Sequence, residues 1–390
     1  MVKLLIKLFI KDSEDTKNLS VRTAYGMLSG FVGIAVNLIL TAAKFIVGSL
    51  SGSISITADA VNNLSDAGSS VVTLVGFKMS KKPADKAHPY GHGRVEYISA
   101  LIVSFLVLIM GLELLKSSVG KIQNPGTVTF SFAALIILVL SILFKLWLAY
   151  FNSTVGKKIN STANKAVVAD SLSDTAATSA ALISLIISKF SSVPVDGWFG
   201  LIVAGFIIFS GIGIIKDTLA PLLGQPPAKE FCDKIEQKIL SYDGVIGVHD
   251  LIVHDYGPGR LFASAHAEVP ADVNILTSHD TIDLIERDIG REFNMLISIH
   301  LDPVITNDKR INHLKQITEE AVKSIDPAFS IHDFRVVDGP THTNLIFDTV
   351  VPMNNKLRDY EINNLICEKL SKIDERYFCV ITVEYSFNEN

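Results

Sequence analysis

The sequence predicts an α-helical membrane domain of six transmembrane helices, followed by α+β modules in tandem in the cytosol. Two observations predict this: the mean hydropathy of the 390-residue chain is +0.37, and its charges are divided unevenly. Residues 23–220 hold 14 basic and 9 acidic side chains, whereas residues 221–390 hold 16 basic and 28 acidic ones. A single soluble globule is therefore excluded, and the acidic tail predicts no nucleic-acid partner.

The N-terminal arm, residues 1–22, is short and rich in lysine. It lacks a long apolar core and a small-residue cleavage site, so we expect a cytosolic arm and not a signal peptide. The chain has three widely spaced cysteines, all in the acidic tail, which is typical of reduced cytosolic thiols. They are Cys232, Cys367 and Cys379.

Six segments within residues 23–220 are candidates for membrane spans, each of which needs about 20 mostly apolar residues. The second and fifth are the least apolar, because both contain aspartates. Basic residues are concentrated in the N-terminal arm and in the loops after the second and fourth segments, so we expect both termini in the cytosol. The predicted spans are residues 23–48, 54–78, 96–119, 127–152, 162–189 and 198–219.

Polar residues recur at the same spacing in the second and fifth spans. Asn62 and Asp66 lie four residues apart in NNLSD, and Asp170 and Asp174 lie four apart in DSLSD. Residues at this spacing share one helix face, so two helices can present four oxygen ligands to each other. Asp59, one turn before Asn62, could orient ligands, relay protons or make a plain contact between helices.

An ionised carboxylate at the centre of a membrane costs about 2.5–3.5 kcal/mol, so several together require a compensating cation. The alternative is protonated carboxyls hydrogen-bonded between helices, although hydroxyls or amides would join helices at less cost. We therefore expect a divalent-cation site. Its donors include no His or Cys, so Mn²⁺ fits best, Fe²⁺ second, and Zn²⁺ less well. The expected ligands are Asn62, Asp66, Asp170 and Asp174.

The loop after the second span, KKPADKAHPYGHGRVEY, contains a second group of metal-binding residue types. Asp85, His88 and His92 are three and four residues apart, as on one helical turn. Pro89, Gly91 and Gly93 favour a turn instead. Either geometry could hold a metal. Two solvated histidines in a polar loop remain the alternative.

Residues 225–307 alternate as helix, strand, strand, helix and strand, which predicts a small α+β module. Residues 308–390 repeat this pattern, since SIHDFRVVD follows GVHDLIVHD at an interval of about 80 residues. The first copy has five candidate metal ligands. The alternative is that its histidines are solvated surface residues and bind no metal. The five candidates are His249, His266, His279, His300 and Asp302.

The second copy is predicted to be degenerate, serving as a scaffold or a dimerisation unit. Only His332 matches a histidine of the first copy, namely His249. The other matched positions have changed residue type. They pair His266 with Asp348, His300 with Glu384, and Asp302 with Ser386.

Through about residue 307 the chain resembles the cation diffusion facilitator family. The six spans, the paired motifs on the second and fifth, the HPYGHGR loop, and VHDL and HLDP in the tail carry the resemblance. It implies export of divalent metals from the cytosol in exchange for protons, by a homodimer in the cell membrane with ferredoxin-like cytosolic domains. The implied ligands are Asn62, Asp66, Asp170 and Asp174 for transport, Asp85, His88 and His92 in the loop, and His249, His266, His279, His300 and Asp302 in the cytosol.

Two departures from the family pattern bear on the metal. Zinc-transporting relatives carry His where this chain has Asp170, and many relatives carry Asp where it has Asn62. The ligand set therefore resembles the manganese-transporting branch. The second module has no counterpart in the simplest members, so the resemblance implies no role for it.

The predicted function is Mn²⁺/H⁺ antiport by alternating access, in which protons and metal compete for the same carboxylates. An Fe²⁺ or Zn²⁺ exporter of the same family is the alternative, and a cation channel or a membrane-bound metal sensor is the alternative from another class. The sequence predicts no enzyme. An intramembrane aspartyl protease needs one acid on each of two helices, which leaves a third acid beside an asparagine without a role.

Overall fold

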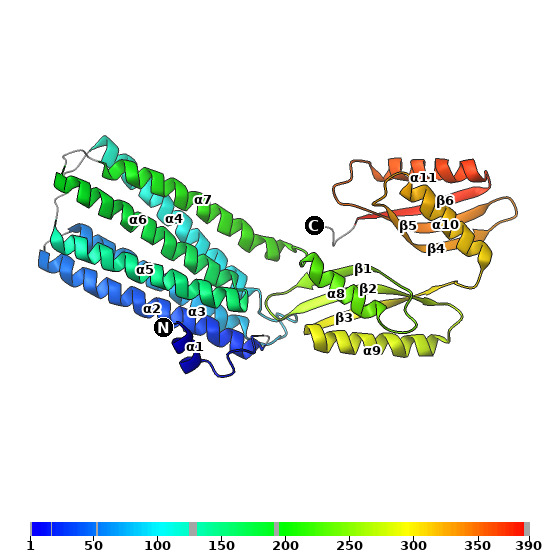
Figure 1. The fold of residues 1–390 in the computed structure, drawn as a ribbon, viewed down its shortest axis with the longest axis horizontal. Helices are drawn as coiled ribbons and strands as arrows, with labels where there is room; N and C mark the ends of the chain where they lie inside the picture. Colours follow the sequence, from blue (N-terminus) through cyan, green and yellow to red (C-terminus); the bar gives the residue numbers. More distant parts are fainter. Residues whose placement is uncertain (1, 17, 52–53, 125–130, 191–194, 386–390) are drawn as a thin grey trace. The chain divides into compact units, whose positions relative to one another are not determined.

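The computed structural model describes residues 2–16, 18–51, 54–124, 131–190 and 195–385 (Figure 1). The chain divides into two compact units. One comprises Met1–Gln225 with Tyr256–Arg260, and the other comprises Pro226–Asp255 with Leu261–Asn390. The first unit is built from helices, and the second combines helices with two three-stranded sheets.

Long helices make up the first unit, with α2 packed along α3, α4 along α7, and α5 along α6. Smaller contacts join α3 and α6 to α4, and α2 to α5. The pairs bring the second and fifth predicted spans, which are α3 and α6, into the same bundle. The helices are α1 (Val2–Phe9), α2 (Leu19–Ser51), α3 (Ile54–Ser80), α4 (Val95–Gln123), α5 (Phe132–Ile159), α6 (Thr162–Phe190) and α7 (Asp196–Leu223).

Within the described residues, four helices are long and apolar enough to cross a membrane, namely α2, α4, α5 and α7. The helices α3 and α6 have 27 and 29 residues and are therefore long enough. They fall short in apolar character because they carry the polar motifs of the two repeated segments. A helical membrane domain is thus confirmed, whereas the crossing of the membrane by α3 and α6 stays a prediction.

Three glycines allow α2 and α3 to approach closely. A Cβ added at Gly30 would lie 2.8 Å from the Cβ of Leu74, and Cβ atoms at Gly26 and Gly33 would overlap Phe77 and Ser70. Small residues at this spacing are typical of helix pairs in membranes, where close backbone approach replaces the hydrophobic driving force. This contact fixes α3, and with it the polar motif that α3 carries.

A buried ion pair joins the first turns of α2 and α4. The Arg22 guanidinium donates to both carboxylate oxygens of Glu96, at 2.5 and 2.9 Å, and the Ser161 hydroxyl donates to Glu96 at 2.7 Å. Glu96 is fully buried. Such bidentate pairs hold geometry well when every charge has a partner, so this cluster fixes one end of the bundle.

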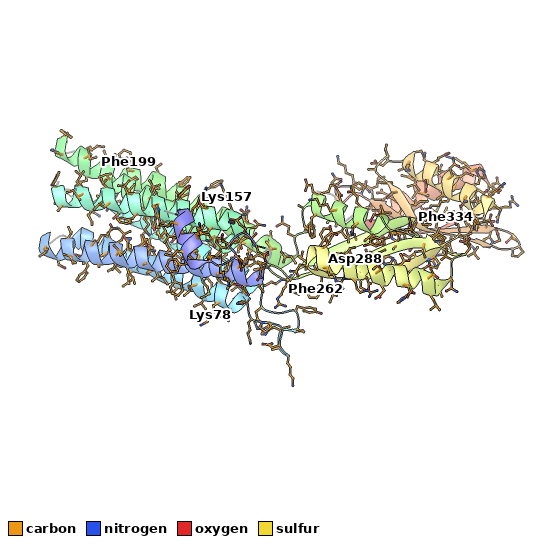
Figure 2. All side chains as sticks on the ribbon, turned by 60° about the horizontal axis from the view of Figure 1, so that its bottom comes forward. Lys78, Lys157, Phe199, Phe262, Asp288 and Phe334 are labelled. Atoms are coloured by element: carbon orange, nitrogen blue, oxygen red, sulfur yellow. The ribbon has the colours of Figure 1, made fainter. Side chains whose placement is uncertain are left out.

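Basic residues lie at this end of the bundle. Lys78 and Lys157 are close to the C-terminal ends of α3 and α5, whereas Phe199 lies in the first turn of α7, at the opposite end (Figure 2). Lysines at helix C-termini complement the helix dipole. The same distribution of charge is the basis for predicting that this end faces the cytosol.

The second unit contains two copies of one α+β module, and the predicted order of helix, strand, strand, helix and strand is confirmed in each. In both, the first two strands are antiparallel and the last two are parallel, and the helices pack on the sheet. The first module has α8 (Lys229–Leu240), β1 (Gly247–Asp255), β2 (Leu261–Pro270), α9 (Ile275–Phe293) and β3 (Met295–Val304). The second has α10 (Lys309–Lys323), β4 (Ser330–Asp338), β5 (Thr343–Val351), α11 (Asp359–Ile373) and β6 (Tyr377–Tyr385).

The strand register corrects the predicted match between the two copies. His266 is opposite His300, and its counterpart Asp348 is opposite Thr382, so Thr382 takes the place of His300 and Glu384 the place of Asp302. Two predicted pairs, His300 with Glu384 and Asp302 with Ser386, were therefore wrong by two residues, whereas the pair of His266 with Asp348 is kept. A slip of two preserves the alternation of a strand, so the sequence pattern could not detect it. Ser386 lies outside the described residues.

Candidate metal centres

Three aspartates of the membrane unit lie together. Asp66 on α3 and Asp170 and Asp174 on α6 each place a carboxylate oxygen within 4.8 Å of the others. Asp66 and Asp170 are buried. The aspartates of the two similar motifs, one on α3 and one on α6, therefore lie close together, as predicted from the sequence. Metal binding at this place stays a prediction.

The cluster borders a cavity of about 270 Å³, lined among others by Asn62, Asp66 and Asp174. Asp170 is buried beside them, and its Oδ1 has no hydrogen-bond partner among the residues that the structure describes. A buried carboxylate oxygen without a partner is costly. Oxygen donors around a cavity of this kind suit a hard divalent cation.

A lysine that the sequence analysis missed pairs with two of these aspartates. The Nζ atom of Lys145 on α5 lies 2.7 Å from Asp66 Oδ2 and 2.5 Å from Asp174 Oδ2. Lys145 is 3% exposed, so its ammonium group is a buried positive charge in contact with two of the three carboxylates. The sequence did contain a signal, because a lone charged residue inside an apolar span is by default functional.

Asp59 has a separate counter-ion. The Nζ atom of the buried Lys44 on α2 lies 2.7 Å from Asp59 Oδ2 and donates to Asn63 Oδ1 at 2.6 Å. Asp59 and Lys44 both line the cavity, but Asp59 is not part of the group of three carboxylates. Of the roles left open for Asp59, an ion pair between helices is the one that this geometry supports.

The loop between α3 and α4 brings its three predicted ligands together. The Oδ1 atom of Asp85 lies 3.4 Å from His88 Nδ1, and its Oδ2 lies 3.6 Å from His92 Nε2. The segment is a turn and not a helix, because Asp85 and His88 exchange backbone hydrogen bonds. Ligand atoms of all three residues lie within 4.8 Å of one another.

Asp85 is already engaged by a lysine. Lys82 donates to Asp85 Oδ2 at 2.7 Å, and the backbone N–H of His88 donates to Oδ1 at 2.9 Å. These bonds, with that of Lys82 the stronger, hold the pKa of Asp85 well below its usual range. The carboxylate is therefore ionised at neutral pH, and a metal at this position would compete with Lys82 for it.

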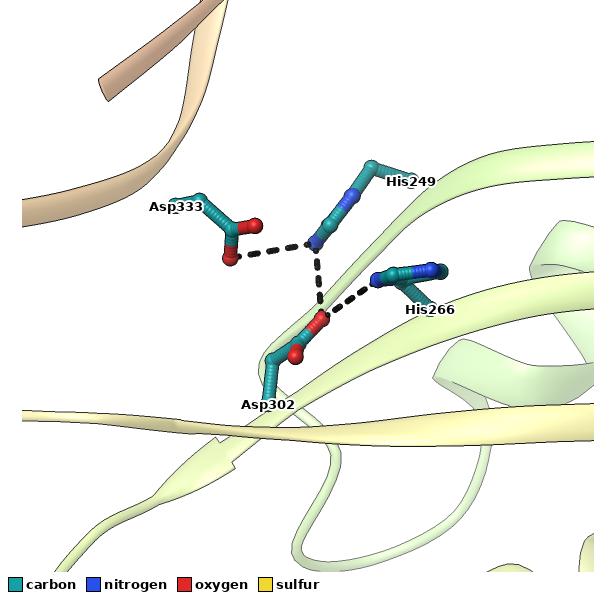
Figure 3. Close-up of side chains that lie close together, drawn as sticks. All are labelled: His249, His266, Asp302 and Asp333. Carbon is teal, nitrogen blue, oxygen red and sulfur yellow. Dashed lines mark hydrogen bonds and ion pairs between the residues drawn. The ribbon is translucent and has the colours of Figure 1, made fainter.

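Figure 3 shows the group in the second unit that contains His249, His266 and Asp302. They lie on β1, β2 and β3, and Asp302 Oδ2 lies 2.8 Å from His266 Nδ1 and 3.3 Å from His249 Nε2. The fourth member, Asp333 on β4, belongs to the second module and lies 3.9 Å from His249 Nε2. Asp333 was not among the ligands predicted from the sequence, because a pattern within one module does not indicate a ligand supplied by the other.

The other two predicted ligands of this region lie differently. His300 Nε2 is 3.2 Å from Asp302 Oδ1, and the His300 ring is 4.8 Å from that of His266, but its side chain is 67% exposed. His279 is exposed on α9. In the described part of the chain, neither His279 nor His300 belongs to the compact group. That group consists of His249, His266, Asp302 and Asp333.

Nearby carboxylates raise the pKa of His249. Burial alone would lower the pKa of His249, but a contact with Asp250 at 3.1 Å and the nearby carboxylates of Asp333 and Asp302 raise it overall. The same contact lowers the pKa of Asp250. A metal ion needs a neutral imidazole, so a metal and a proton would compete for His249.

Comparisons with known proteins identify the first unit and the first module of the second unit. Residues 30–223 match the cation efflux transmembrane domain, and residues 227–304 match the cytoplasmic domain of cation efflux proteins. The chain is 32% identical over 252 residues to an uncharacterized transporter of Methanocaldococcus jannaschii, covering 64% of this chain and 88% of the relative.

Two further relatives have names that state an activity. The manganese efflux system protein MneS of Bacillus subtilis is 30% identical over 285 residues, covering 72% of this chain and 96% of MneS. The cation-efflux pump FieF of Escherichia coli is 28% identical over 284 residues, covering 72% of this chain and 94% of FieF. The chain therefore belongs to the cation diffusion facilitator family of cation efflux transporters, with a helical transmembrane domain followed by a cytosolic α+β domain.

Proposed function

We propose that this divalent-cation efflux transporter is a Mn²⁺/H⁺ antiporter that works by alternating access. The observation that carries the proposal is the buried group of Asp66, Asp170 and Asp174, whose carboxylate oxygens lie within 4.8 Å of one another beside a cavity. Carboxylates can bind either a cation or protons, so one site can serve both directions of exchange. Asn62 adds a neutral carbonyl oxygen that cannot titrate.

Mn²⁺ is the favoured ion because the proposed donors are all oxygens. Zn²⁺ normally draws His or Cys into its coordination shell, whereas Mn²⁺ accepts carboxylate and amide oxygens. The similarity to MneS, named as a manganese efflux protein, supports the same choice. Fe²⁺ and then Zn²⁺ are the alternatives, and FieF is named only as a cation-efflux pump.

The proposal includes a topology and a dimer. The helices α3 and α6 would complete six spans, with both termini in the cytosol and the chain in the cell membrane. Such polar helices are tolerated where neighbouring helices surround them, and α2, α4 and α5 pack against α3 or α6. The match to the cytoplasmic domain of cation efflux proteins supports a homodimer. The loop group and the cytosolic group would bind the same metal as regulators.

Lys145 gives the transport cycle an internal counter-ion. In the structure its ammonium group forms ion pairs with both Asp66 and Asp174. A divalent cation entering from the cytosol would compete with Lys145 for these carboxylates, and Lys145 would reoccupy them once the metal has left. Asp66 and Asp174 would then have a positive partner both before the metal binds and after it leaves, which matters in a medium of low dielectric constant.

Reconstituted liposomes test the proposal. With Mn²⁺ and a pH gradient across the membrane, we expect flux that falls roughly tenfold when an ionophore collapses the gradient, because protons drive the return of the carrier. Protein-free liposomes and the Asp217→Asn variant, changed at an exposed position of α7, are the controls. Flux that persists without a gradient would identify a channel, and binding without flux would identify a sensor.

Substitution of Asp170 by histidine tests the choice of metal. We expect Asp170→His to shift the ratio of Zn²⁺ to Mn²⁺ transport toward zinc by about tenfold, since an imidazole suits Zn²⁺ better than a carboxylate does. Competitive uptake of Mn²⁺, Fe²⁺ and Zn²⁺ measures this ratio. Asp217→His, the same change outside the site, should leave it unaltered. An unchanged ratio in Asp170→His would contradict the argument from donor hardness.

A further inference from the structure

Both cytosolic modules have a β-bulge at the same place, where the first two strands pair. A module that served only as a scaffold would not need this feature. The pairing of β1 with β2 shifts register directly after His249, and that of β4 with β5 shifts directly after His332. At both bulges the next residue is an aspartate in the left-handed region, with φ of 49° for Asp250 and 54° for Asp333. Such conformations are uncommon for residues other than glycine and concentrate at functional sites.

Each of these aspartates faces the histidine of the other module. Asp333 Oδ1 lies 3.9 Å from His249 Nε2, and Asp250 Oδ1 lies 3.8 Å from His332 Nε2. The two imidazole rings stack, with their centroids 4.1 Å apart and their planes at 26°. The arrangement is reciprocal, so the boundary between the modules has approximate twofold symmetry within one chain.

His332 is a buried side chain at this boundary between the modules. It is 5% exposed, and neither of its ring nitrogens forms a hydrogen bond with any residue that the structure describes. Its Nε2 lies 3.3 Å from Glu384 Oε2, and ligand atoms of His332, Asp333 and Asp348 lie within 4.8 Å of one another. A buried imidazole that lies among carboxylates without a hydrogen bond to any of them calls for an explanation, and a cation held between these groups would supply it.

The corrected register completes the correspondence between the modules. The strands that present His249, His266 and Asp302 in the first module present His332, Asp348 and Glu384 in the second. The first set contains two imidazoles and one carboxylate, and the second contains one imidazole and two carboxylates. The donor atoms of the second set are therefore richer in oxygen than those of the first set. A potential metal ligand remains at each of the three matched positions.

We infer that the second module holds a divalent-cation site of its own, formed by His332, Asp348 and Glu384 together with Asp250 of the first module. The site is the counterpart of the group of His249, His266, Asp302 and Asp333, and each module lends one aspartate to the other. One imidazole with three carboxylates suits Mn²⁺ or Fe²⁺ better than Zn²⁺. The second module is thus a ligand-binding partner within the chain, and not a degenerate copy.

Equilibrium dialysis of Mn²⁺ against the purified full-length chain tests this site without any transport measurement. We expect Glu384→Gln and Asp348→Asn each to weaken one Mn²⁺ site by about tenfold or more, with the remaining sites unchanged. Glu375→Gln, a matched change at an exposed position of the same module, should bind as the unaltered chain does. If both ligand variants bind Mn²⁺ as Glu375→Gln does, the inference is wrong.

Hydrogen exchange of the unaltered chain provides a measurement that does not depend on variants. Mn²⁺ should slow amide exchange in β4 and β6 by about tenfold, because a bound ion stabilises the strands that hold it. Exchange in these strands that is the same with and without Mn²⁺ would overturn the inference, even if the variants fail to fold. Both measurements report binding at the second module, so they can fail while proton-coupled transport is confirmed, and the reverse.

Discussion

Replacement of Asp174 by alanine is expected to lower the rate of Mn²⁺ transport by roughly a hundredfold, equivalent to about 2.7 kcal/mol. Asp174 supplies one of the three carboxylates in the buried cluster, and its Oδ2 lies 2.5 Å from Lys145 Nζ. Alanine removes a proposed metal ligand and one of the two carboxylates that pair with Lys145. Two carboxylates and one amide cannot then neutralise a divalent ion and Lys145 together.

The measurement is Mn²⁺ flux into liposomes at a fixed pH gradient, with the amount of reconstituted protein matched. Asp217→Ala is the control, because it makes the same substitution at an exposed position of α7. Asp174→Asn separates the loss of charge from the loss of a donor, and it should retain more transport than alanine. Transport by Asp174→Ala at half the original rate or more would mean that the buried cluster is not the transport site.

The fold was predictable to the extent that it depends on local patterns. Hydropathy and the alternation of basic loops predicted the helical bundle, and the period of apolar residues predicted the order of helices and strands in the first module. The polar motifs of α3 and α6 also lie together as their spacing indicated. In these cases one helix or one strand contains the whole signal, so no knowledge of distant contacts was needed.

The candidate sites were less predictable, because they depend on which distant residues meet. Lys145 lies 79 positions after Asp66 in the chain, and nothing in its own span indicates which helix it faces. The role of Asp333 depends on how two tandem modules pack, which no pattern within either module reveals. The prediction for β6 failed for a third reason. A shift of two residues leaves the alternation of a strand unchanged, so the sequence pattern does not fix the register.

Replacement of Lys145 by methionine is expected to raise the affinity of the membrane site for Mn²⁺ by roughly tenfold to a hundredfold while slowing turnover. A unit charge at 4 Å contributes about 4 kcal/mol at an effective dielectric constant of 20, and part of this is offset by repulsion among the carboxylates once the ammonium is gone. Methionine has a similar length and no charge, so it removes the competitor for Asp66 and Asp174 and largely preserves the packing of α5.

Transport kinetics separate this prediction from a simple loss of structure. For Lys145→Met both KM and kcat for Mn²⁺ should fall, because the ion binds more tightly and leaves more slowly, whereas a misfolded variant would lose kcat without a gain in affinity. Lys145→Arg keeps the charge and should keep a high KM, and Lys216→Met, at an exposed position of α7, should change neither constant. An unchanged or higher KM in Lys145→Met would show that Lys145 does not compete with the metal. Its ion pairs with Asp66 and Asp174 would then serve only to hold α3, α5 and α6 together.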